Sequence, residues 1–436
     1  MSTLLLCLLP LLTFTGASKV PRKYCNEAMD TGSIPPLPTA ATLIQVHVLH
    51  RHGARTKSSS TSPPFWLNED NVHYNCTTHL LEGSDATADP ATSVLYRKIY
   101  ANHRNSLKGN CMHGQLVAAG VAQCQASGRK LFQAYQDFLP STPVGHESEF
   151  HLRSDDCPRT LASGQALFSA MYPNISSVVP WITMDIGGDA ETIAPNPRVC
   201  PALTAAFNAA MQRYRASPHY TNITIPLAQK VSVALNRTVA PENVGGLLDP
   251  LMSVQCATVP SSGGAPPPAF TPALQQQTID EEVHRLYYGC NDTEVAKFGA
   301  GPLLGEILVF VEQAIAGDVT PKFIQWSGHD TGPMAPVLGA LRIGGAEFPV
   351  FNDLLSIEVY RLQELNTRVG DAFGVRVIHD GNIVTGFIPG CAASVAGVCA
   401  WTKFQATVVA LVPTASECGR TDDPEWWPRP SSHVLR

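Results

Sequence analysis

The sequence has few charged residues, and neither sign dominates. Charged residues make up 15% of the 436 residues, and the formal net charge is −6 at pH 7. A chain without a basic excess has no electrostatic field that would attract nucleic acid, so we expect no nucleic-acid partner. Any affinity for phosphate must come from a few arginines that lie close together.

Long apolar runs are also scarce. Beyond the first residues, no stretch approaches the roughly 20 apolar residues that a membrane-spanning helix needs. The apolar run at 406–412 has only the length of a strand. We therefore expect no membrane span. Residues 1–18 are leucine-rich and end in small residues, which predicts a signal peptide and a secreted, lysosomal or endosomal lumenal protein.

Several catalytic motifs are missing. No cysteine is followed by arginine six positions later, and no Gly-x-Ser-x-Gly elbow, His-Glu-x-x-His or phosphate loop occurs. His47, His50 and His52 are close in sequence, but His47 and His50 point to opposite faces of a strand, so one cation could not easily bind all three. We expect neither a metal nor a cofactor.

Cysteines and glycosylation sequons agree with an exported protein. Cys7 lies in the predicted signal peptide and is one of twelve cysteines, so the remaining number is odd and one thiol should be free. Asparagines in Asn-x-Ser/Thr sequons predict a glycoprotein: Asn75, Asn174, Asn222, Asn236 and Asn291.

Strand and helix patterns alternate along the chain. Short β-branched and apolar runs at 41–49 and 323–326 predict buried strands. Apolar residues at helical intervals predict helices at 115–138, 159–171 and 301–316, the second capped by Asp155 or Asp156. This alternation favours an α/β fold with a mostly parallel sheet that is flanked by helices.

The domain organisation follows from where this alternation breaks down. We expect one unit at 38–420, whose α/β core comprises about 38–60, 109–200 and 300–412. The less regular segments, about 61–108 and 201–299, are predicted to form a smaller and mainly helical cap. Residues 421–436 look like an irregular tail. The sequence leaves open whether the protein is a homodimer.

The pentad Arg51-His52-Gly53-Ala54-Arg55 follows the first predicted strand directly. Two guanidinium groups can each grip a phosphate through paired hydrogen bonds, and Gly53 would let the backbone approach an anion. His52 between them is the candidate nucleophile. The surrounding positive charge should lower its pKa and keep a neutral, attacking nitrogen.

Two further clusters stand where a site is expected. His329-Asp330 follows the strand at 323–326, so it should face the pentad across neighbouring strand ends. There His329 would donate to phosphate and Asp330 would protonate the leaving group, which implies an acidic pH optimum. Arg153 stands just before a predicted helix and would add a third phosphate-binding fork, whereas Arg159 is interpreted as structural.

These motifs together resemble the histidine acid phosphatase family, the branch of the histidine phosphatases that includes prostatic, lysosomal and lysophosphatidic acid phosphatases. The likeness covers nearly the whole predicted mature chain. Its other landmarks are Gly114-Gln115-Leu116, Gly120, Gly128, Arg153-Ser154, Arg159-Thr160-Leu161, Cys200-Pro201, Gly301-Pro302-Leu303-Leu304, Glu306-Ile307-Leu308, Pro389-Gly390-Cys391 and Cys418.

The resemblance implies an acid phosphatase that hydrolyses phosphate monoesters. It assigns His52 as the residue phosphorylated in a covalent intermediate and Asp330 as the proton donor, with phosphate bound by Arg51, Arg55, Arg153 and His329. It implies no metal and a phosphoglycerate mutase-like core with a helical cap. It also suggests the disulfides Cys200–Cys418 and Cys391–Cys399. We further expect Cys256 to pair with Cys290.

Three positions depart from the family pattern. Lys57 stands where proline is usual, Asp155 replaces threonine after Arg153-Ser154, and Pro158 replaces an acidic residue. A carboxylate at Asp155 would weaken phosphate binding if it pointed inward. The substrate stays open between phosphoproteins, lipid phosphates and small esters, and the alternatives are a phytase-like enzyme or a catalytically silent binding protein that keeps the fold.

Overall fold

The computed structural model describes residues 25, 34–38, 41–58, 64–66, 69–77, 107–140, 149–174, 179–185, 188–256, 264–318, 320–344, 347–362, 371–392 and 396–420. The predicted signal peptide at 1–18, the tail at 421–436 and parts of the segment 61–108 lie outside the described residues.

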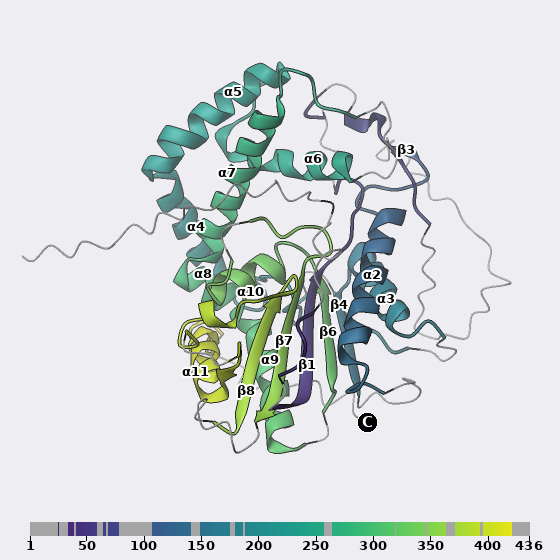
Figure 1. The fold of residues 1–436 in the computed structure, drawn as a ribbon. Coiled ribbons are helices and arrows are strands. Elements are labelled where there is room, and N and C mark those ends of the chain that lie inside the picture. The colour runs from purple at the N-terminus through teal and green to yellow at the C-terminus, as the bar shows by residue number, and fades with distance from the viewer. Residues whose placement is uncertain are drawn as a thin grey trace, which may run out of the picture.

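A single large sheet forms the centre of the molecule (Figure 1). Its strands run in the order β10-β8-β7-β1-β6-β4-β5, and β9 pairs with β8. The strands are β1 (Ala41–Arg51), β4 (Phe150–Asp155), β5 (Ile182–Met184), β6 (Phe323–Gly328), β7 (Leu354–Leu362), β8 (Phe373–His379), β9 (Asn382–Ile383) and β10 (Cys399–Ala400). A separate two-stranded sheet pairs β2 (His73–Tyr74) with β3 (Lys108–Gly109).

The sheet is mixed. Strands β1, β6, β4 and β5 pair in parallel, as the alternation of strands and helices predicts. Strand β7 pairs with β1 in the antiparallel sense, and β8, β9 and β10 continue that antiparallel part. The α/β prediction is confirmed, with a narrower parallel part than expected. Both strands that precede the predicted site residues, β1 and β6, belong to the parallel part.

Helices cover both faces of this sheet. Val46 and Val48 of β1 belong to a core cluster with residues of α2 (Ala118–Tyr135) and α3 (Pro158–Met171). Leu49 points to the other face and belongs to a cluster with residues of α9 (Gly301–Ala316), α10 (Met334–Ala340) and α11 (Trp401–Leu411). A strand buried on both faces is mostly apolar, and the polar side chains of β1, such as Gln45 and His47, have buried hydrogen-bond partners.

Further helices lie beyond one end of the sheet (Figure 1). They are α4 (Ala202–Arg215), the π-helix η3 (Tyr220–Thr224), α5 (Ile225–Leu235), the 3₁₀ turns η4 (Pro241–Asn243) and η5 (Gly245–Leu247), α6 (Leu248–Gln255), α7 (Pro272–Cys290) and α8 (Thr293–Gly299). Residues of α5 to α6 have an apolar core of their own. The short 3₁₀ turns η1 (Glu69–Asn71) and η6 (Thr385–Phe387) complete the described elements.

The predicted helices at 115–138, 159–171 and 301–316 correspond to α2, α3 and α9. One local expectation is wrong. The residue at the N-cap of α3 is Cys157, without a side-chain cap, because the Asp155 carboxylate contacts His329 instead. The apolar run at 406–412, which is too short to span a membrane, belongs largely to helix α11 (Trp401–Leu411).

The disulfides agree with the resemblance in part. Cys200–Cys418 and Cys391–Cys399 form as suggested. Cys256 pairs with Cys25, so the suggested Cys256–Cys290 pair is wrong.

The other cysteines also differ from the expectation of one free thiol. Cys76 and Cys111 form a further disulfide. Among the described residues three thiols are free, namely Cys124, Cys157 and Cys290. Cys290, at the end of α7, packs against Gly339 of α10, and burial raises the pKa of its thiol to about 12.

The surface carries the predicted sequons. Asn75, Asn174, Asn222 and Asn236 are exposed, whereas Asn291 is half-buried at the end of α7.

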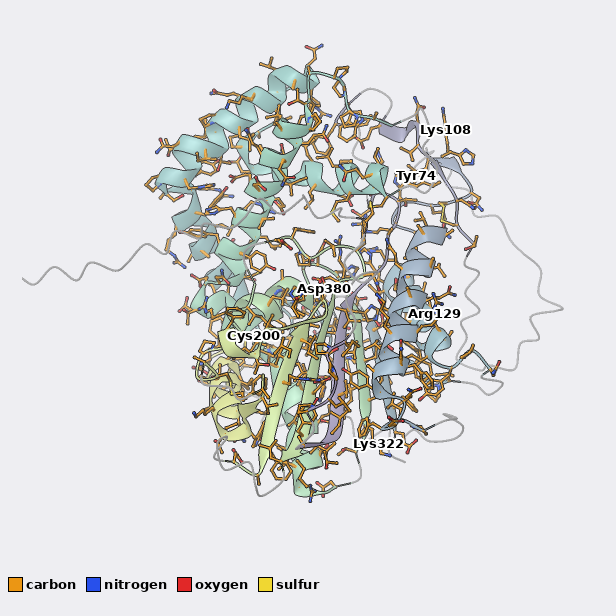
Figure 2. All side chains as sticks on the ribbon, viewed as in Figure 1. Tyr74, Lys108, Arg129, Cys200, Lys322 and Asp380 are labelled. Carbon is orange, nitrogen blue, oxygen red and sulfur yellow. A yellow bond between two sulfur atoms is a disulfide. The ribbon has the colours of Figure 1, made fainter. Side chains whose placement is uncertain are left out.

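Within the described ranges no single helix has the length and apolarity to cross a membrane, although the bent pair α8 and α9 passes that test together. Figure 2 places Lys322, just before β6, and Asp380, just after β8, at opposite ends of the sheet.

Candidate active site

The register of β1 and β6 brings the two strongest sequence motifs together. Arg51 pairs with Gly328, and the backbone N–H of His52 donates to the Gly328 carbonyl over 2.9 Å. His329 therefore starts its loop beside His52, and the centroids of the two rings lie 5.2 Å apart. The carboxyl ends of parallel strands are where α/β proteins bind their ligands.

His52 is buried and held in one tautomer. Its Nδ1 lies 2.9 Å from the carbonyl oxygen of Gly53, which can only accept, so Nδ1 carries the proton. Nε2 is left with a lone pair and accepts from Nε of Arg55 over 3.4 Å. Burial and the nearby charges of Arg55 and Arg51 hold the pKa of His52 well below its usual value. The ring is thus neutral, and the Nε2 lone pair can attack a substrate once the phosphate draws the Arg55 donor to its own oxygens.

The pentad backbone is occupied by protein contacts. The N–H of Gly53 donates to the Ser163 hydroxyl over 3.1 Å, and the N–H of Ala54 donates to the Gln123 side chain over 2.9 Å. A Cβ on Gly53 would lie only 2.4 Å from the carbonyl oxygen of Gly120. Gly53 therefore serves close packing against α2, and an anion here must be held by side chains.

Arg51 has its guanidinium group between Asp330, the Pro349 carbonyl and the Phe351 ring. It is buried, lies over the Phe351 ring at 4.4 Å, and donates to the Pro349 carbonyl over 2.6 Å. Burial lowers the pKa of Arg51 to about 10, partly offset by Asp330, so it remains a cation at physiological pH. Its Nε is a buried donor without a hydrogen-bond partner. A ligand oxygen would satisfy that donor.

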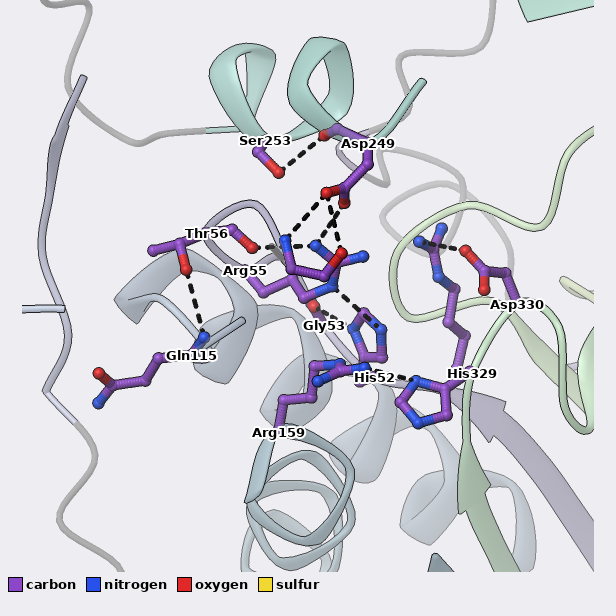
Figure 3. A network of polar contacts seen from close by, with 12 residues as sticks. His52, Gly53, Arg55, Thr56, Gln115, Arg159, Asp249, Ser253, His329 and Asp330 are labelled. Atoms are coloured by element: carbon purple, nitrogen blue, oxygen red, sulfur yellow. Dashed lines mark hydrogen bonds and ion pairs between the residues drawn. The ribbon is translucent and has the colours of Figure 1, made fainter. Parts of the chain in front are cut away.

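Arg55 links the pentad to the helical layer. Its Nη1 contacts Asp249 of α6 at 2.6 Å, and the same carboxylate accepts from the backbone N–H of Ser58 over 2.9 Å (Figure 3). Although burial opposes ionisation, Arg55 lowers the pKa of Asp249. The α6 carboxylate thus neutralises part of the positive charge on the side of the site that faces away from the sheet.

Arg159 also belongs to this cluster, although sequence reasoning interpreted it as structural. It lies in the first turn of α3, its Nη2 is 3.3 Å from Nδ1 of His329, and its buried Nε has no hydrogen-bond partner. Burial and the neighbouring Arg55 lower its pKa. Figure 3 shows Arg55, Arg159 and His329 around His52. The sequence signals for it were its place at the N-terminus of a helix and the Arg159-Thr160-Leu161 landmark of the family resemblance.

Arg153 lies elsewhere and corrects the prediction of a third phosphate-binding fork. It is buried inside β4, over the Trp326 ring at 5.6 Å, and its guanidinium group is ion-paired to Glu306 and donates to Thr192 over 3.0 Å. Glu191, 3.5 Å away, completes the network, and burial raises the pKa of Glu191 to about 7. With these carboxylates as partners, Arg153 holds α9 to the sheet.

Asp330 faces the cluster from the other side. Its carboxylate forms an ion pair with Arg51 at 2.7 Å and accepts from the backbone N–H of Thr331 over 2.8 Å. Burial favours the neutral carboxyl, but the charges of Arg51 and Arg55 outweigh it and lower the pKa of Asp330. Without a ligand, Asp330 is therefore a carboxylate.

Two of the departures from the family pattern have identifiable partners. Lys57 forms a buried ion pair with Glu69 of η1 at 2.8 Å. Asp155 contacts Nε2 of His329 at 2.7 Å. Pro158 begins helix α3, where proline is well tolerated.

Outside the His52 cluster, the described residues contain one group of side chains that could hold a metal ion. Asp353, His379 and Asp380 bring carboxylate and imidazole atoms within 4.8 Å of one another, with His379 Nε2 2.8 Å from Asp353. His47 instead contacts Gln45 at 2.9 Å, and His50 contacts Ser327 at 2.6 Å. These strand histidines have separate buried partners and do not converge on one point.

The strand ends of this α/β sheet place an unprotonated histidine nitrogen among arginines, which together offer the nucleophile and the cationic donors that phosphoryl transfer needs. The model of the histidine phosphatase superfamily (branch 2) matches residues 42–356, and the chain belongs to this superfamily.

Characterised relatives are moderately similar. Counting factor 60 of Dictyostelium discoideum is 28% identical over 77% of this chain and 80% of its own. Human lysophosphatidic acid phosphatase type 6 is 25% identical over 73% and 74%. Bovine lysosomal acid phosphatase is 27% identical over 50% and 53%.

Solved structures share the fold. Hafnia alvei phytase superposes with a TM-score of 0.54 at 14% identity, covering 88% of this chain and 99% of the phytase. The Bifidobacterium longum multiple inositol polyphosphate phosphatase in complex with inositol hexasulfate gives 0.55 at 12% identity, covering 90% and 96%.

Proposed function

We propose that the protein is an acid phosphatase that hydrolyses phosphate monoesters through a phosphohistidine on His52. The observation that carries this proposal is the state of His52: Nδ1 is held by the Gly53 carbonyl and Nε2 is unprotonated and turned toward Arg55. A neutral imidazole nitrogen among fixed guanidinium groups is suited to attack a phosphorus atom whose oxygens those groups bind.

The first step forms the intermediate. The Nε2 lone pair of His52 attacks phosphorus, the bond from phosphorus to the ester oxygen breaks, and the protonated carboxyl of Asp330 gives its proton to the departing alkoxide. Arg51, Arg55, Arg159 and His329 bind the phosphoryl oxygens throughout. In the second step water attacks phosphorus, Asp330 takes its proton, and the electron pair of the broken P–N bond returns to Nε2.

Asp330 needs a proton that the empty site does not favour. Arg51 holds it as a carboxylate when no ligand is bound. A phosphate ester brings negative charge to Arg51 and weakens that pair, and its monoanion, present below a second pKa of about 6, also brings a proton. Both effects support the acidic optimum that the sequence predicts.

The substrate is proposed to be a simple phosphate monoester. Lysophosphatidic acid phosphatase type 6 and lysosomal acid phosphatase are both named for such activities, and both are similar in sequence. The phytases share the fold at 13–16% identity, and a likeness this low says nothing about the substrate of this chain. The carboxylate of Asp249 against Arg55 favours substrates with one phosphate over polyanions such as inositol hexakisphosphate.

Export to an oxidising compartment is part of the proposal. Disulfides such as Cys25–Cys256, which closes a sequence separation of 231 residues, persist in secreted and lumenal proteins and are rare in the cytosol. The apolar stretch at 1–18 and the exposed sequons support the same route.

The test is the release of phosphate from para-nitrophenyl phosphate between about pH 4 and 8, with and without chelator, for the parent protein and His52→Ala. We expect activity with an acidic optimum, unaffected by chelator and lost in the variant. Activity that survives His52→Ala would overturn the mechanism. Correctly folded protein without activity on any monoester would favour the silent binding protein.

A further inference from the structure

Asp155 is a buried carboxylate that belongs to the site although the family pattern has threonine there. It is the last residue of β4, beside the end of β6, and Ser154 pairs with Ser327. Its Oδ2 lies 2.7 Å from Nε2 of His329, and its Oδ1 accepts from the Thr160 hydroxyl. Because both oxygens have partners on rigid elements, the carboxylate is fixed in place.

This contact determines which nitrogen of His329 faces a substrate. A carboxylate can only accept, so Nε2 donates to Asp155. The other nitrogen, Nδ1, lies 3.3 Å from Nη2 of Arg159. Figure 3 shows Arg159 and His329 next to His52, and the centroids of the His329 and His52 rings lie 5.2 Å apart. In the empty site Nδ1 accepts from the Arg159 guanidinium group, which can only donate. To donate to a phosphate oxygen instead, Nδ1 must be protonated as well, and the ring is then a cation.

The groups around His329 act on its charge in opposite directions. Burial and Arg159 disfavour the cation, whereas Asp155 and the thiol of Cys157 favour it and prevail, so the pKa of His329 is raised above its usual value. His52 contacts the ring and is neutral, and Asp330 follows it in the chain as a carboxylate. The carboxylate of Asp155 is the fixed negative charge in direct contact with the ring.

We infer that Asp155 is a positioning residue, which fixes the His329 ring through Nε2 and makes Nδ1 a cationic donor for the phosphoryl oxygens. The inference rests on the proposed function. In this arrangement the carboxylate strengthens phosphate binding instead of repelling the substrate, because the His329 cation neutralises its charge. It works through another side chain and does not touch the substrate.

The pH dependence follows with a definite sign. A raised pKa keeps the His329 cation present to a higher pH, and the donor is lost as the pH rises through that pKa. Asp155→Asn keeps the shape of the side chain but removes the charge. Burial and Arg159 then lower the pKa of His329 with only Cys157 opposing them, so the donor is lost at a lower pH.

The experiment compares Asp155→Asn with Asp156→Asn, whose side chain is exposed in the neighbouring position. The kcat/KM for para-nitrophenyl phosphate and the Ki of inorganic phosphate are measured between about pH 4 and 8. For Asp155→Asn we expect at least a tenfold loss of kcat/KM near pH 7, a loss below threefold near pH 4.5, and an alkaline limb shifted to lower pH. The control should match the parent. An Asp155→Asn profile that parallels the parent at every pH would overturn the inference.

Two measurements separate this inference from the proposed function. In the His329→Ala background, Asp155→Asn should shift the pH profile no further, and a further shift would show that Asp155 acts through another group. Histidine NMR of the parent protein, which needs no activity and no folded variant, should give His329 a pKa above 6.5. A value at or below 6.5 would refute the inference even if phosphatase activity were present.

Discussion

We expect Arg159→Ala to lose activity and keep its stability, and Arg153→Ala to lose stability and keep its activity. Two charge-assisted hydrogen bonds from one guanidinium group, each contributing about 1.5–3 kcal/mol, bind the phosphoryl oxygens in our account. Allowing for partial compensation by Arg55, Arg159→Ala should lose about 2–4 kcal/mol of transition-state binding, or roughly 30- to 1000-fold in kcat/KM. Its thermal stability should hold or rise, because a cation leaves a crowded positive cluster.

Arg153→Ala leaves the carboxylates of Glu306 and Glu191 buried without their cation. Breaking a buried pair in this way typically costs about 3–5 kcal/mol, a large part of the stability of an ordinary domain. We therefore expect a marked fall in the melting temperature, and near-parental kcat/KM at temperatures where the variant is folded. The two variants are compared by calorimetry and by para-nitrophenyl phosphate kinetics. A stable but inactive Arg153→Ala, or an Arg159→Ala within threefold of the parent, would refute the assignment.

Two further predictions concern the carboxylates of the site. Asp330→Asn removes the proposed acid, so kcat/KM, which reports the phosphorylation step, should fall by about 10²–10⁴-fold for esters with poor leaving groups and far less for para-nitrophenyl phosphate; an equal fall of kcat/KM for both would argue against that role. Asp249→Asn removes a charge that competes for Arg55, so the Ki of inorganic phosphate should fall about three- to tenfold, and activity on inositol hexakisphosphate should rise relative to para-nitrophenyl phosphate. A higher Ki would mean that Asp249 serves to orient Arg55.

The sequence predicts the two central strands and the site residues that follow them, because there the local residue pattern agrees with the place of the segment in the fold. The strands at 41–49 and 323–326 are short, β-branched and apolar because they are buried on both faces, and the pentad follows the first directly. Parallel pairing of these strands then brings His52 and His329 together without further information.

What the sequence does not predict depends on side-chain direction and on distant partners. Arg153 and Arg159 flank the same helix start, but residue 153 lies inside a strand and points to Glu306, whereas residue 159 lies in the first helical turn and points to the strand ends. The partner of Cys256 is Cys25, which is 231 residues away, and spacing gives no hint of it.

Trapping the phosphorylated enzyme tests the central claim most directly. Asp330→Asn should still be phosphorylated by para-nitrophenyl phosphate, whose leaving group needs little acid, but should hydrolyse the intermediate slowly because it lacks the base. After rapid quenching in alkali, peptide mass spectrometry should find one phosphoryl group on His52. A phosphoryl group on another residue, or hydrolysis that proceeds with no phosphorylated protein under these conditions, would contradict the account.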